Sequence, residues 1–553
     1  MRRMRTLLLG LIIGLLWLSA CGTPTAPAPT QTTTTASQPT TAPVAPATTR
    51  SAPQQLILAI GGESEDGYDP TLGWGRYGSP LFQSTLLQRN EQLQLVNDLA
   101  TDYTISADKL VWTINIRQDA KFSDGKPVTS EDVAYTFTKA QESGGKTDVT
   151  TLDKAVVTGP YQVELHLKQP QSTFVQRLAT LGIVPKHAHG PDYAQKPIGS
   201  GPYTLVSWEK GKQLIVEANP LYYGTQPQIK RLVFLFVDSE GDGAFIAAKA
   251  GQVQVASVPP SLAVQQIPNM RLVDVKSVDN RGIMFPYVAD EGKKTPTGYP
   301  IGNNVTADRA IRQAINYVID RKALVQGVLE GYGSPAYGPV SGLAWEQPQA
   351  TIEDTNLATA KQLLADGGWQ AGSDGVLVKD GLKAAFTLIY PASDATRQAL
   401  ALSAADMVRP LGITINVEGK GWDDIEKLMH SNAILFGWGS HDQTEMYNLY
   451  HSSAAGQGFY NTGYYANQSI DSTLDLALGA PSEQEAIAFW QKAQWDGTNG
   501  FTTKGDAAWA WLVNLDHTYF VDQCLDIGTP QIEPHGHGWP ITAGIVNWKW
   551  TCK

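Results

Sequence analysis

Apolar and polar residues alternate along several short stretches of this chain, and each stretch predicts a β-strand. Residues 110–116 (LVWTINI) alternate with a period close to two, which is typical of a strand with one buried face. A short apolar run over 55–60 ends at a Gly-Gly pair and predicts a buried strand that leads into a loop. Further strands are predicted at 162–167, 213–218, 231–237, 413–417 and 434–436.

Stretches with helical periodicity lie between these predicted strands. Residues 307–319 place alanine, isoleucine and valine on one face and predict a strong amphipathic helix. Thr129 is a candidate N-cap, with Asp132 at the third helical position, so a helix should begin after Thr129. Residues 400–408 are helical in pattern and precede Pro410. Because strands and helices mingle throughout, the fold class is α/β or α+β with several sheets.

The amino end carries the features of an export signal. Three arginines precede an apolar run over 7–18, and small residues lead to Cys21. Leu-Ser-Ala before a cysteine resembles the lipobox of bacterial lipoproteins. This resemblance implies that 1–20 are removed and that Cys21 becomes a lipidated first residue at the outer face of the cytoplasmic membrane. A plain membrane anchor and an ordinary secretory signal are the alternatives.

Residues 21–53 are dominated by threonine, proline, alanine and serine and have no periodic apolar pattern. Such a stretch cannot bury enough apolar surface to offset its ordering entropy. We therefore expect a disordered tether between the lipid and the folded part.

The remaining 500 or so residues suffice for two or three domains, by the size at which single cores stop growing. With 42% apolar and 17% charged residues, the composition is that of an ordinary globular protein. The formal net charge is -11. An acidic surface repels nucleic acid and anionic lipid headgroups, so neither is an expected partner.

The chain holds three cysteines. If Cys21 carries lipid, Cys524 and Cys552 remain as an even pair in an oxidising compartment. We predict a disulfide between them that ties the C-terminal tail to the body, closing a loop of roughly 28 residues. Two free thiols are the alternative.

Three blocks carry a resemblance to a known family. They are 112–133, with FSDGKPVTSEDV at its end, 197–203 (PIGSGPY) and 309–321 (RAIRQAINYVIDR), the last followed by Gly-Tyr-Gly at 331–333. As an ordered set they resemble the family 5 extracellular solute-binding proteins of ABC importers, the peptide, nickel and opine group. The resemblance spans most of the chain from residue 55 to about 476.

This resemblance implies a two-lobed α/β fold of the periplasmic-binding-protein type (type II, cluster C), with three subdomains and a hinge. The lobes would close on a ligand. The expected divisions are lobe I over 54–300 with an inserted subdomain at about 96–195, lobe II over 301–514, and a C-terminal return to lobe I over 515–553.

The resemblance also implies a function. The chain would be a monomeric, lipid-anchored, extracytoplasmic receptor that captures short peptides for an ABC permease and its ATPase subunits. Import of a nickel or other metal-chelate complex is the alternative, and that metal would be cargo, since no resident cofactor is expected. A secreted hydrolase is a third hypothesis, from a different class. We expect no enzyme, because the sequence holds no Gly-x-Ser-x-Gly elbow, zinc-binding His-Glu-x-x-His helix or P-loop.

In peptide-binding relatives, a tryptophan of the second lobe is followed three positions later by an aspartate that pairs with the peptide amine. Here Trp438 is followed by His441 at that position and by Asp442 one position later. Adjacent side chains of an extended segment point to opposite faces. Asp442 is therefore either an amine anchor, if the turn bulges, or a structural loop carboxylate.

The presence of His441 where relatives have an aspartate also suggests a metal-binding site. His441 lies close in sequence to Asp442 and Glu445, and His535 and His537 form a His-x-His pair near the C-terminus. Alternate residues of an extended run face one side, so two imidazoles could bind one metal ion. A solvated loop or a hydrogen-bonded turn is the alternative for this pair.

Other residues are weaker ligand candidates. Arg281 could receive a ligand carboxylate or form a surface ion pair. Glu63 could meet an amine or remain a solvated loop acid. Aromatic residues in or beside loops could line a cleft or belong to the core, namely Tyr68, Trp74, Trp345, Trp422, Tyr447 and Trp539.

Overall fold

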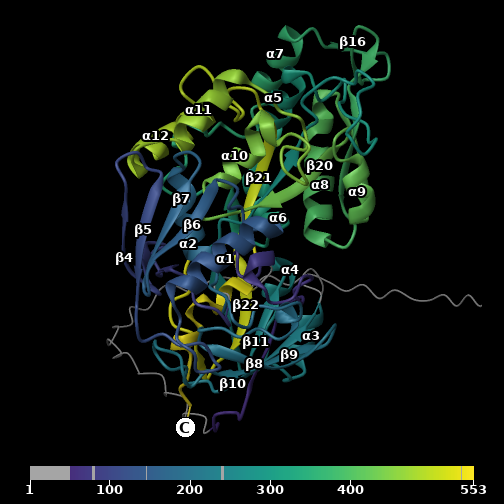
Figure 1. The fold of residues 1–553 in the computed structure, drawn as a ribbon. Coiled ribbons are helices and arrows are strands. Elements are labelled where there is room, and N and C mark those ends of the chain that lie inside the picture. The colour runs from purple at the N-terminus through teal and green to yellow at the C-terminus, as the bar shows by residue number, and fades with distance from the viewer. Residues whose placement is uncertain (1–49, 78–80, 145, 238–241, 537–538, 553) are drawn as a thin grey trace, which may run out of the picture. The chain divides into compact units, whose positions relative to one another are not determined.

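Three β-sheets organise the folded part of the chain (Figure 1). The computed structural model describes residues 50–77, 81–144, 146–237, 242–536 and 539–552. Cys21, nearly all of the predicted tether and His537 lie outside the described residues, and so do the predictions made for them.

The seven-stranded sheet has the order β12-β22-β11-β1-β10-β9-β8. Its central strand β1 is buried along nearly its whole length and pairs in parallel with β10 and β11, which explains its continuous apolar sequence. The strands are β1 (Leu56–Gly61), β8 (Tyr203–Glu209), β9 (Gln213–Ala218), β10 (Arg231–Phe236), β11 (Val255–Val258), β12 (Met270–Val275) and β22 (His517–Asp522).

The four-stranded sheet has the order β4-β5-β7-β6. In β5 buried and half-buried positions alternate, which places Trp112, Ile114 and Ile116 on the core side. Helix α1 begins after Thr129, whose backbone N–H donates to Asp132 at 2.9 Å, as the capping pattern predicts. The elements are β4 (Ala100–Ile105), β5 (Val111–Ile116), β6 (Leu152–Gly159), β7 (Gln162–Leu167), α1 (Ser130–Ser143) and α2 (Val175–Thr180).

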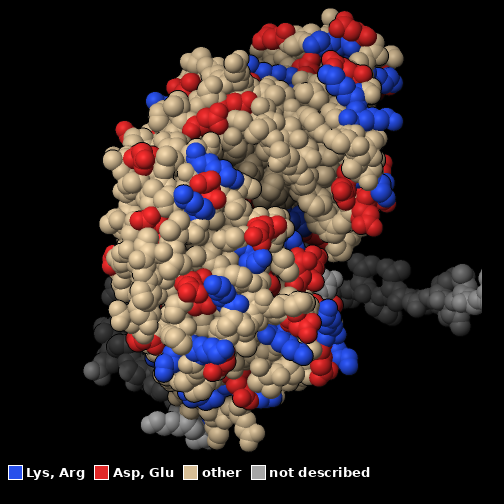
Figure 2. All heavy atoms as spheres, viewed as in Figure 1, with Lys and Arg blue, Asp and Glu red and all other residues tan. Residues whose placement is uncertain are grey.

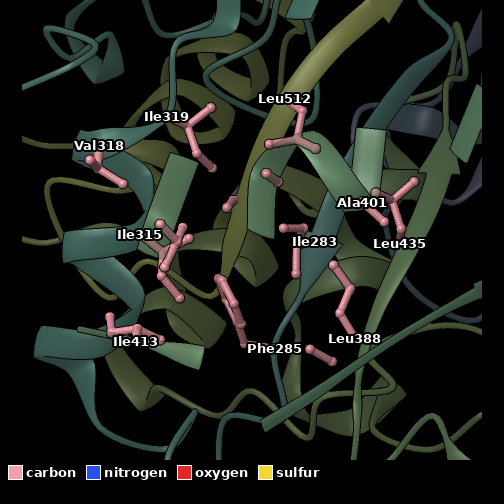
Figure 3. Packing of buried hydrophobic residues seen from close by; sticks show 14 of the residues in the cluster. Ile283, Phe285, Ile315, Val318, Ile319, Leu388, Ala401, Ile413, Leu435 and Leu512 are labelled. Carbon is pink, nitrogen blue, oxygen red and sulfur yellow. The ribbon is translucent and has the colours of Figure 1, made fainter. Parts of the chain in front are cut away.

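The six-stranded sheet has the order β14-β21-β13-β20-β18-β19. Figure 3 shows part of its core, where Ile283, Leu435 and Leu512 of the sheet pack with Ile315 and Ala401 of two helices. Its elements are β13 (Asn280–Met284), β14 (Gly333–Pro335), β18 (Ala385–Pro391), β19 (Thr414–Lys420), β20 (Ala433–Trp438), β21 (Trp509–Leu515), α5 (Arg309–Val318) and α8 (Ala395–Val408).

Smaller elements complete the described fold. The helices are α3 (Gly243–Lys249), α4 (Pro260–Ala263), α6 (Arg321–Gly327), α7 (Leu357–Asp366), α9 (Trp422–Leu428), α10 (Thr444–Tyr450), α11 (Gln468–Leu478) and α12 (Glu483–Gln494). The short strands are β2 (Leu87–Arg89), β3 (Leu95–Asn97), β15 (Gln370–Ala371), β16 (Leu377–Lys379), β17 (Leu382–Lys383), β23 (Leu525–Asp526) and β24 (Lys549–Trp550).

The helix predicted over 307–319 is α5, and the helix predicted over 400–408 is the second half of α8. Helix α8 begins five residues earlier than its apolar pattern suggests. The cause is Asp394, whose carboxylate accepts the backbone N–H of Arg397 at 2.8 Å and caps the helix.

The chain passes between the seven-stranded and six-stranded sheets twice among the named strands, from β12 to β13 and from β21 to β22. We call residues 276–279 and 516 the crossings. Because β13 pairs with β20 and β21, the chain enters the six-stranded sheet before residue 300, where the sequence placed the end of the first lobe.

The predicted disulfide between Cys524 and Cys552 is present. It lies beside the pairing of β23 with β24, which brings the C-terminal tail onto the body. The indole N–H of Trp550 donates to the Arg50 carbonyl at 2.9 Å, so the tail also holds the first described residue.

Candidate functional site

A cavity of about 1130 Å³ is bounded by segments from all three sheet regions. The turn after α1 supplies 146–150, the end of β18 supplies Pro391, and the end of β20 supplies 436–438. His535, from the C-terminal segment that follows the seven-stranded sheet, completes the lining. Residues far apart in sequence therefore surround one space.

A smaller recess of about 90 Å³ shares much of this lining, and we call the cavity and the recess together the cleft. The recess is predominantly polar. Residues that line the recess but not the cavity are Arg89, Arg177, Thr180, Ser440, His441, Asp442, Thr444, Glu445 and Pro534.

Asp442 borders the recess, but its carboxylate is paired with the guanidinium of Arg177 on α2. Both side chains are largely buried, at 12% and 8% exposure. Arg177 also donates to Thr444 at 3.2 Å, and Thr444 contacts Thr173 at 2.9 Å. Burial lowers the pKa of Arg177, but the charges of Asp442 and Asp148 and the hydrogen bond to Asp442 together outweigh burial, so the net pKa is raised. In this structure Asp442 therefore links the four-stranded sheet region to the loop after β20.

His441 is buried and forms part of the walls of two spaces, the recess and a separate cavity of about 670 Å³. Burial, together with the positive charge of Arg89, lowers the pKa of His441 to about 3. Its imidazole is therefore neutral at pH 7. Its Nε2 atom has no hydrogen-bond partner among the described residues.

Glu445, in the first turn of α10, lines the recess without forming an ion pair with any described residue. The backbone N–H of Gly439 donates to its carboxylate at 3.3 Å. Burial raises the pKa of Glu445 to about 8, and the neighbouring charges of Asp442 and Asp279 act in the same direction. This carboxyl is therefore mostly protonated at pH 7.

Arg76 is a cation of the cleft that no described carboxylate pairs with, and it lines both the cavity and the recess. Its guanidinium lies 4.4 Å from the ring centre of Tyr77 and donates to the Tyr77 hydroxyl at 3.3 Å. The other basic residue shared by both spaces, Lys146, pairs with Asp66 at 2.7 Å. Arg76 is thus placed to receive an anionic group.

Trp438, the last residue of β20, lines the cleft and stacks on Tyr460 with ring centres 4.8 Å apart. The chain turns at Gly439, where a Cβ atom would lie 2.5 Å from the Val278 carbonyl oxygen. Only glycine allows β20 to approach the first crossing this closely. The Gly439 carbonyl accepts the backbone N–H of His535 at 2.8 Å.

A buried charge cluster links Asp279 of the first crossing to His517 at the start of β22 and to His535 of the cleft lining. His517 Nε2 lies 3.2 Å from Asp279 and its Nδ1 lies 2.6 Å from Glu533, while His535 Nδ1 lies 2.9 Å from Asp279. Burial lowers the pKa of His517, but its hydrogen bonds to Asp279 and Glu533 outweigh this and raise it to about 10. Burial likewise opposes ionisation of Asp279, yet Arg281 and His535 hold its pKa well below the usual range.

Comparison with known proteins identifies the family. Residues 94–460 match the model described as bacterial extracellular solute-binding proteins, family 5 Middle. The chain is also 32% identical to Protein XP55 of Streptomyces lividans over 497 residues, which cover 87% of each chain. The chain belongs to the family 5 extracellular solute-binding proteins.

Other similarities agree with this family and fold. The oligopeptide-binding protein AppA of Bacillus subtilis is 27% identical over 418 residues, 71% of this chain and 74% of AppA. The crystal structure of NikZ from Campylobacter jejuni in complex with Ni(L-His) superposes with a TM-score of 0.77 at 23% identity, covering 90% of this chain and 99% of NikZ. The fold is therefore the two-lobed α/β fold of this family, as predicted.

The structure places the predicted site residues of this family 5 protein in different environments. Trp438, His441 and Asp442 border the cleft. Arg281 is buried, pairs with Asp279 and is not part of the described cleft lining. Glu63 lines another cavity, of about 410 Å³, where it accepts hydrogen bonds from Trp208 and Gly211. Tyr447 donates to Asp475 and stacks on His451, also outside that lining.

The described candidate metal ligands, His441 and His535, are buried or hydrogen-bonded within the protein, and His537 lies outside the described residues. His535 lines the cavity but is hydrogen-bonded to Asp279, and His441 is buried in the recess wall. Within the described ranges, no group of three or more histidine, cysteine or acidic side chains is arranged to hold a metal ion.

In the part of the chain that the structure describes, no helix has the length and apolar character needed to cross a membrane.

Sequence reasoning missed Arg76, Arg177 and Tyr460 as cleft residues. Arg76 stands in a Gly-Trp-Gly-Arg-Tyr segment, and a cation flanked by aromatics in a glycine-rich loop is a signal that could have found it. Arg177 pairs with a residue 265 positions away, so no local pattern marks it.

Proposed function

We propose that this family 5 protein captures short peptides and delivers them to an ABC permease with its ATPase subunits. The observation that supports the proposal most directly is the size and polarity of the cleft. Its cavity of about 1130 Å³ exceeds the roughly 300–1,000 Å³ typical of sites for drug-sized ligands. Arg76 offers a cation within this cleft, which suits a solute that carries a carboxylate.

The two-lobed fold gives this proposal a mechanism. We propose lobes near the divisions predicted from sequence, with the first boundary moved to the crossings at 276–279 and 516. Bending at these two segments would open and shut the cleft without breaking either sheet. Binding would then close the protein on its cargo, and the permease would recognise the closed form. The protein would act as a receptor and not as an enzyme.

We further propose that the mature protein begins at a lipidated Cys21 and works as a monomer outside the cytoplasmic membrane. The Thr/Pro-rich segment would let the folded part reach the permease from its anchor. Mass measurement of the detergent-extracted protein tests this step. A diacylated N-terminal cysteine is expected, and an unmodified chain that begins elsewhere would contradict it.

A metal-chelate complex is the second candidate cargo, because His535 lines the cavity. If it is correct, replacing His535 and His537 with alanine should abolish binding of a nickel–histidine complex and leave peptide binding intact. Unchanged metal affinity in this double variant would eliminate the metal site.

Native mass spectrometry of freshly purified protein, combined with metal analysis, tests the main proposal. We expect masses of bound peptides that disappear after partial unfolding and dialysis, and saturable rebinding of synthetic tripeptides. A wild-type protein that binds no peptide, or that cleaves the peptides it is given, would overturn the proposal.

A further inference from the structure

Two aromatic side chains are exposed inside the cleft, and this exposure is unusual for the molecule. Trp422 is 47% exposed and Phe459 is 38% exposed, and they are the only aromatic residues among the large, exposed apolar side chains of the described chain. Both line the cavity of about 1130 Å³. Single exposed apolar residues are ordinary on protein surfaces, whereas contiguous ones in a concave site indicate a binding surface.

The two side chains form one surface with Phe436 beneath them, and we call these three residues the aromatic shelf. Trp422 stacks on Phe436 with ring planes 10° apart and centres 6.3 Å apart. Phe459 meets Trp422 edge-on at 5.7 Å and Phe436 at 6.1 Å. These are favourable aromatic geometries, so the three rings support one another through direct contacts.

The backbone holds the shelf in place. Phe436 is buried within β20, and Trp422 is the first residue of α9. Phe459 follows Gly458, whose φ of 56° is a left-handed conformation that favours glycine, and both residues line the cavity. Neither Trp422 nor Phe459 belongs to the buried core cluster that contains Phe436, so their exposed faces are not needed for packing.

Two charged residues that line the same cavity balance one another. Asp394 and Arg397 pair together and are only 3% and 6% exposed. This pair therefore offers no unbalanced charge to a ligand group placed on the shelf. Arg76, which also lines the cavity, is the cation proposed above for a ligand carboxylate.

We propose that the aromatic shelf is a subsite for an aromatic or large apolar side chain of the bound peptide. This inference rests on the proposed peptide-binding function and narrows its cargo to peptides that carry such a side chain. When the shelf buries a phenylalanine side chain of the peptide, binding should be about 10- to 100-fold tighter than with an alanine at that position.

Calorimetric titration with defined tripeptides tests the proposal. The probes are Ala-Ala-Ala, the three tripeptides with one phenylalanine and two alanines, and Ala-Glu-Ala and Ala-Lys-Ala. At least one phenylalanine peptide should bind the wild-type protein about 10- to 100-fold more tightly than Ala-Ala-Ala. In Trp422→Ala, Phe459→Ala and the double variant, this preference should fall toward one, because the phenylalanine peptide should lose far more affinity than Ala-Ala-Ala.

Leu402→Ala is the matched control, because Leu402 is 50% exposed on α8 and is not part of the described cavity lining. It should keep the full preference, and melting curves should show that every variant is folded. Equal affinity for all peptides, or tightest binding of a glutamate or lysine peptide, would overturn the shelf's role as an aromatic subsite. The proposal that the protein binds peptides would still stand. Failure of the wild-type protein to bind any of these tripeptides would overturn both proposals.

Discussion

His517 and Asp279 join the two chain crossings directly, with His517 Nε2 lying 3.2 Å from a carboxylate oxygen of Asp279. Asp279 is the last residue before β13, and His517 is the first residue of β22. This contact links the two segments that connect the seven-stranded and six-stranded sheets, and the ion pair of Lys276 with Asp516 at 2.6 Å links them as well. His535 binds the same carboxylate and lines the cleft, so the cluster touches both the crossings and the site.

This pair predicts a specific pH dependence of stability. The pKa of His517 is about 10 in the folded protein, against roughly 6.5 for an unperturbed histidine. A raised folded pKa stabilises fully below the unfolded value and loses its effect as pH rises through the folded value. His517→Gln should therefore lower the melting temperature most at pH 6, and the difference from wild type should shrink toward pH 10.

Thermal melts from pH 5 to 10 measure this difference. His166→Gln is the control, because His166 lies in β7 away from the crossings. A gap between wild type and His517→Gln that stays constant from pH 6 to 10 would contradict the assigned role.

The raised pKa of Glu445 predicts that its substitution stabilises the protein at high pH, whereas substitution of His517 destabilises it. Its folded pKa of about 8 exceeds the roughly 4.3 of a free glutamate, so ionisation costs stability as pH rises from about 4.3 through 8. Glu445→Gln, which keeps the shape and removes the ionisation, should melt like wild type near pH 4.5 and above wild type at pH 9. Loss of stability at pH 9 would show that the ionised carboxylate is needed.

The disulfide should stabilise the C-terminal tail. The loop closed by Cys524 and Cys552 has a sequence separation of 28, for which the chain-entropy model gives about 3–4 kcal/mol. Reductant or Cys552→Ser should lower the free energy of unfolding by about this amount. Reductant should leave the Cys552→Ser variant unaffected, and an equal effect of reductant on that variant would contradict the prediction.

The elements of this fold were largely predictable because their signals are local. Strand β5 alternates with a period of two, and Thr129 caps α1 through residues close by in sequence. The crossings were not predictable in the same way. Strand β13 (NRGIM) is short and mixes polar with apolar residues, and only its pairing with β20 and β21 shows which sheet it joins.

The candidate site was predictable only in part. The sequence identified Trp438 through its resemblance to relatives, and it identified Trp422 only as one of several loop aromatics. It could not show that Arg281 is already paired with Asp279 or that Asp442 is paired with Arg177, because these partners depend on side-chain direction and long-range folding. The sequence around a charged residue does not show whether its side chain already pairs with an opposite charge.

Arg76 should bind the carboxylate of a peptide ligand. Charged hydrogen bonds contribute about 1.5–3 kcal/mol, so Arg76→Ala should weaken binding of Ala-Phe-Ala by about 10- to 150-fold. The C-terminally amidated peptide should bind the wild type and the variant equally. Titration calorimetry measures both, and Arg409→Ala, at an exposed arginine paired with Asp406, is the control. A similar loss of affinity for the amidated peptide would mean that Arg76 does not bind the carboxylate.

The pairing of Asp442 with Arg177 separates two roles for this aspartate. Removing one partner of a buried ion pair leaves an unbalanced charge and typically costs about 3–5 kcal/mol. Asp442→Ala should therefore destabilise the protein by about this amount, and Asp442→Ala combined with Arg177→Met should recover much of the loss. An amine anchor predicts a different pattern, in which N-acetylated and free peptides bind Asp442→Ala equally while its stability is unchanged. Chemical denaturation of the single and double variants, with both peptides as ligands, distinguishes these outcomes.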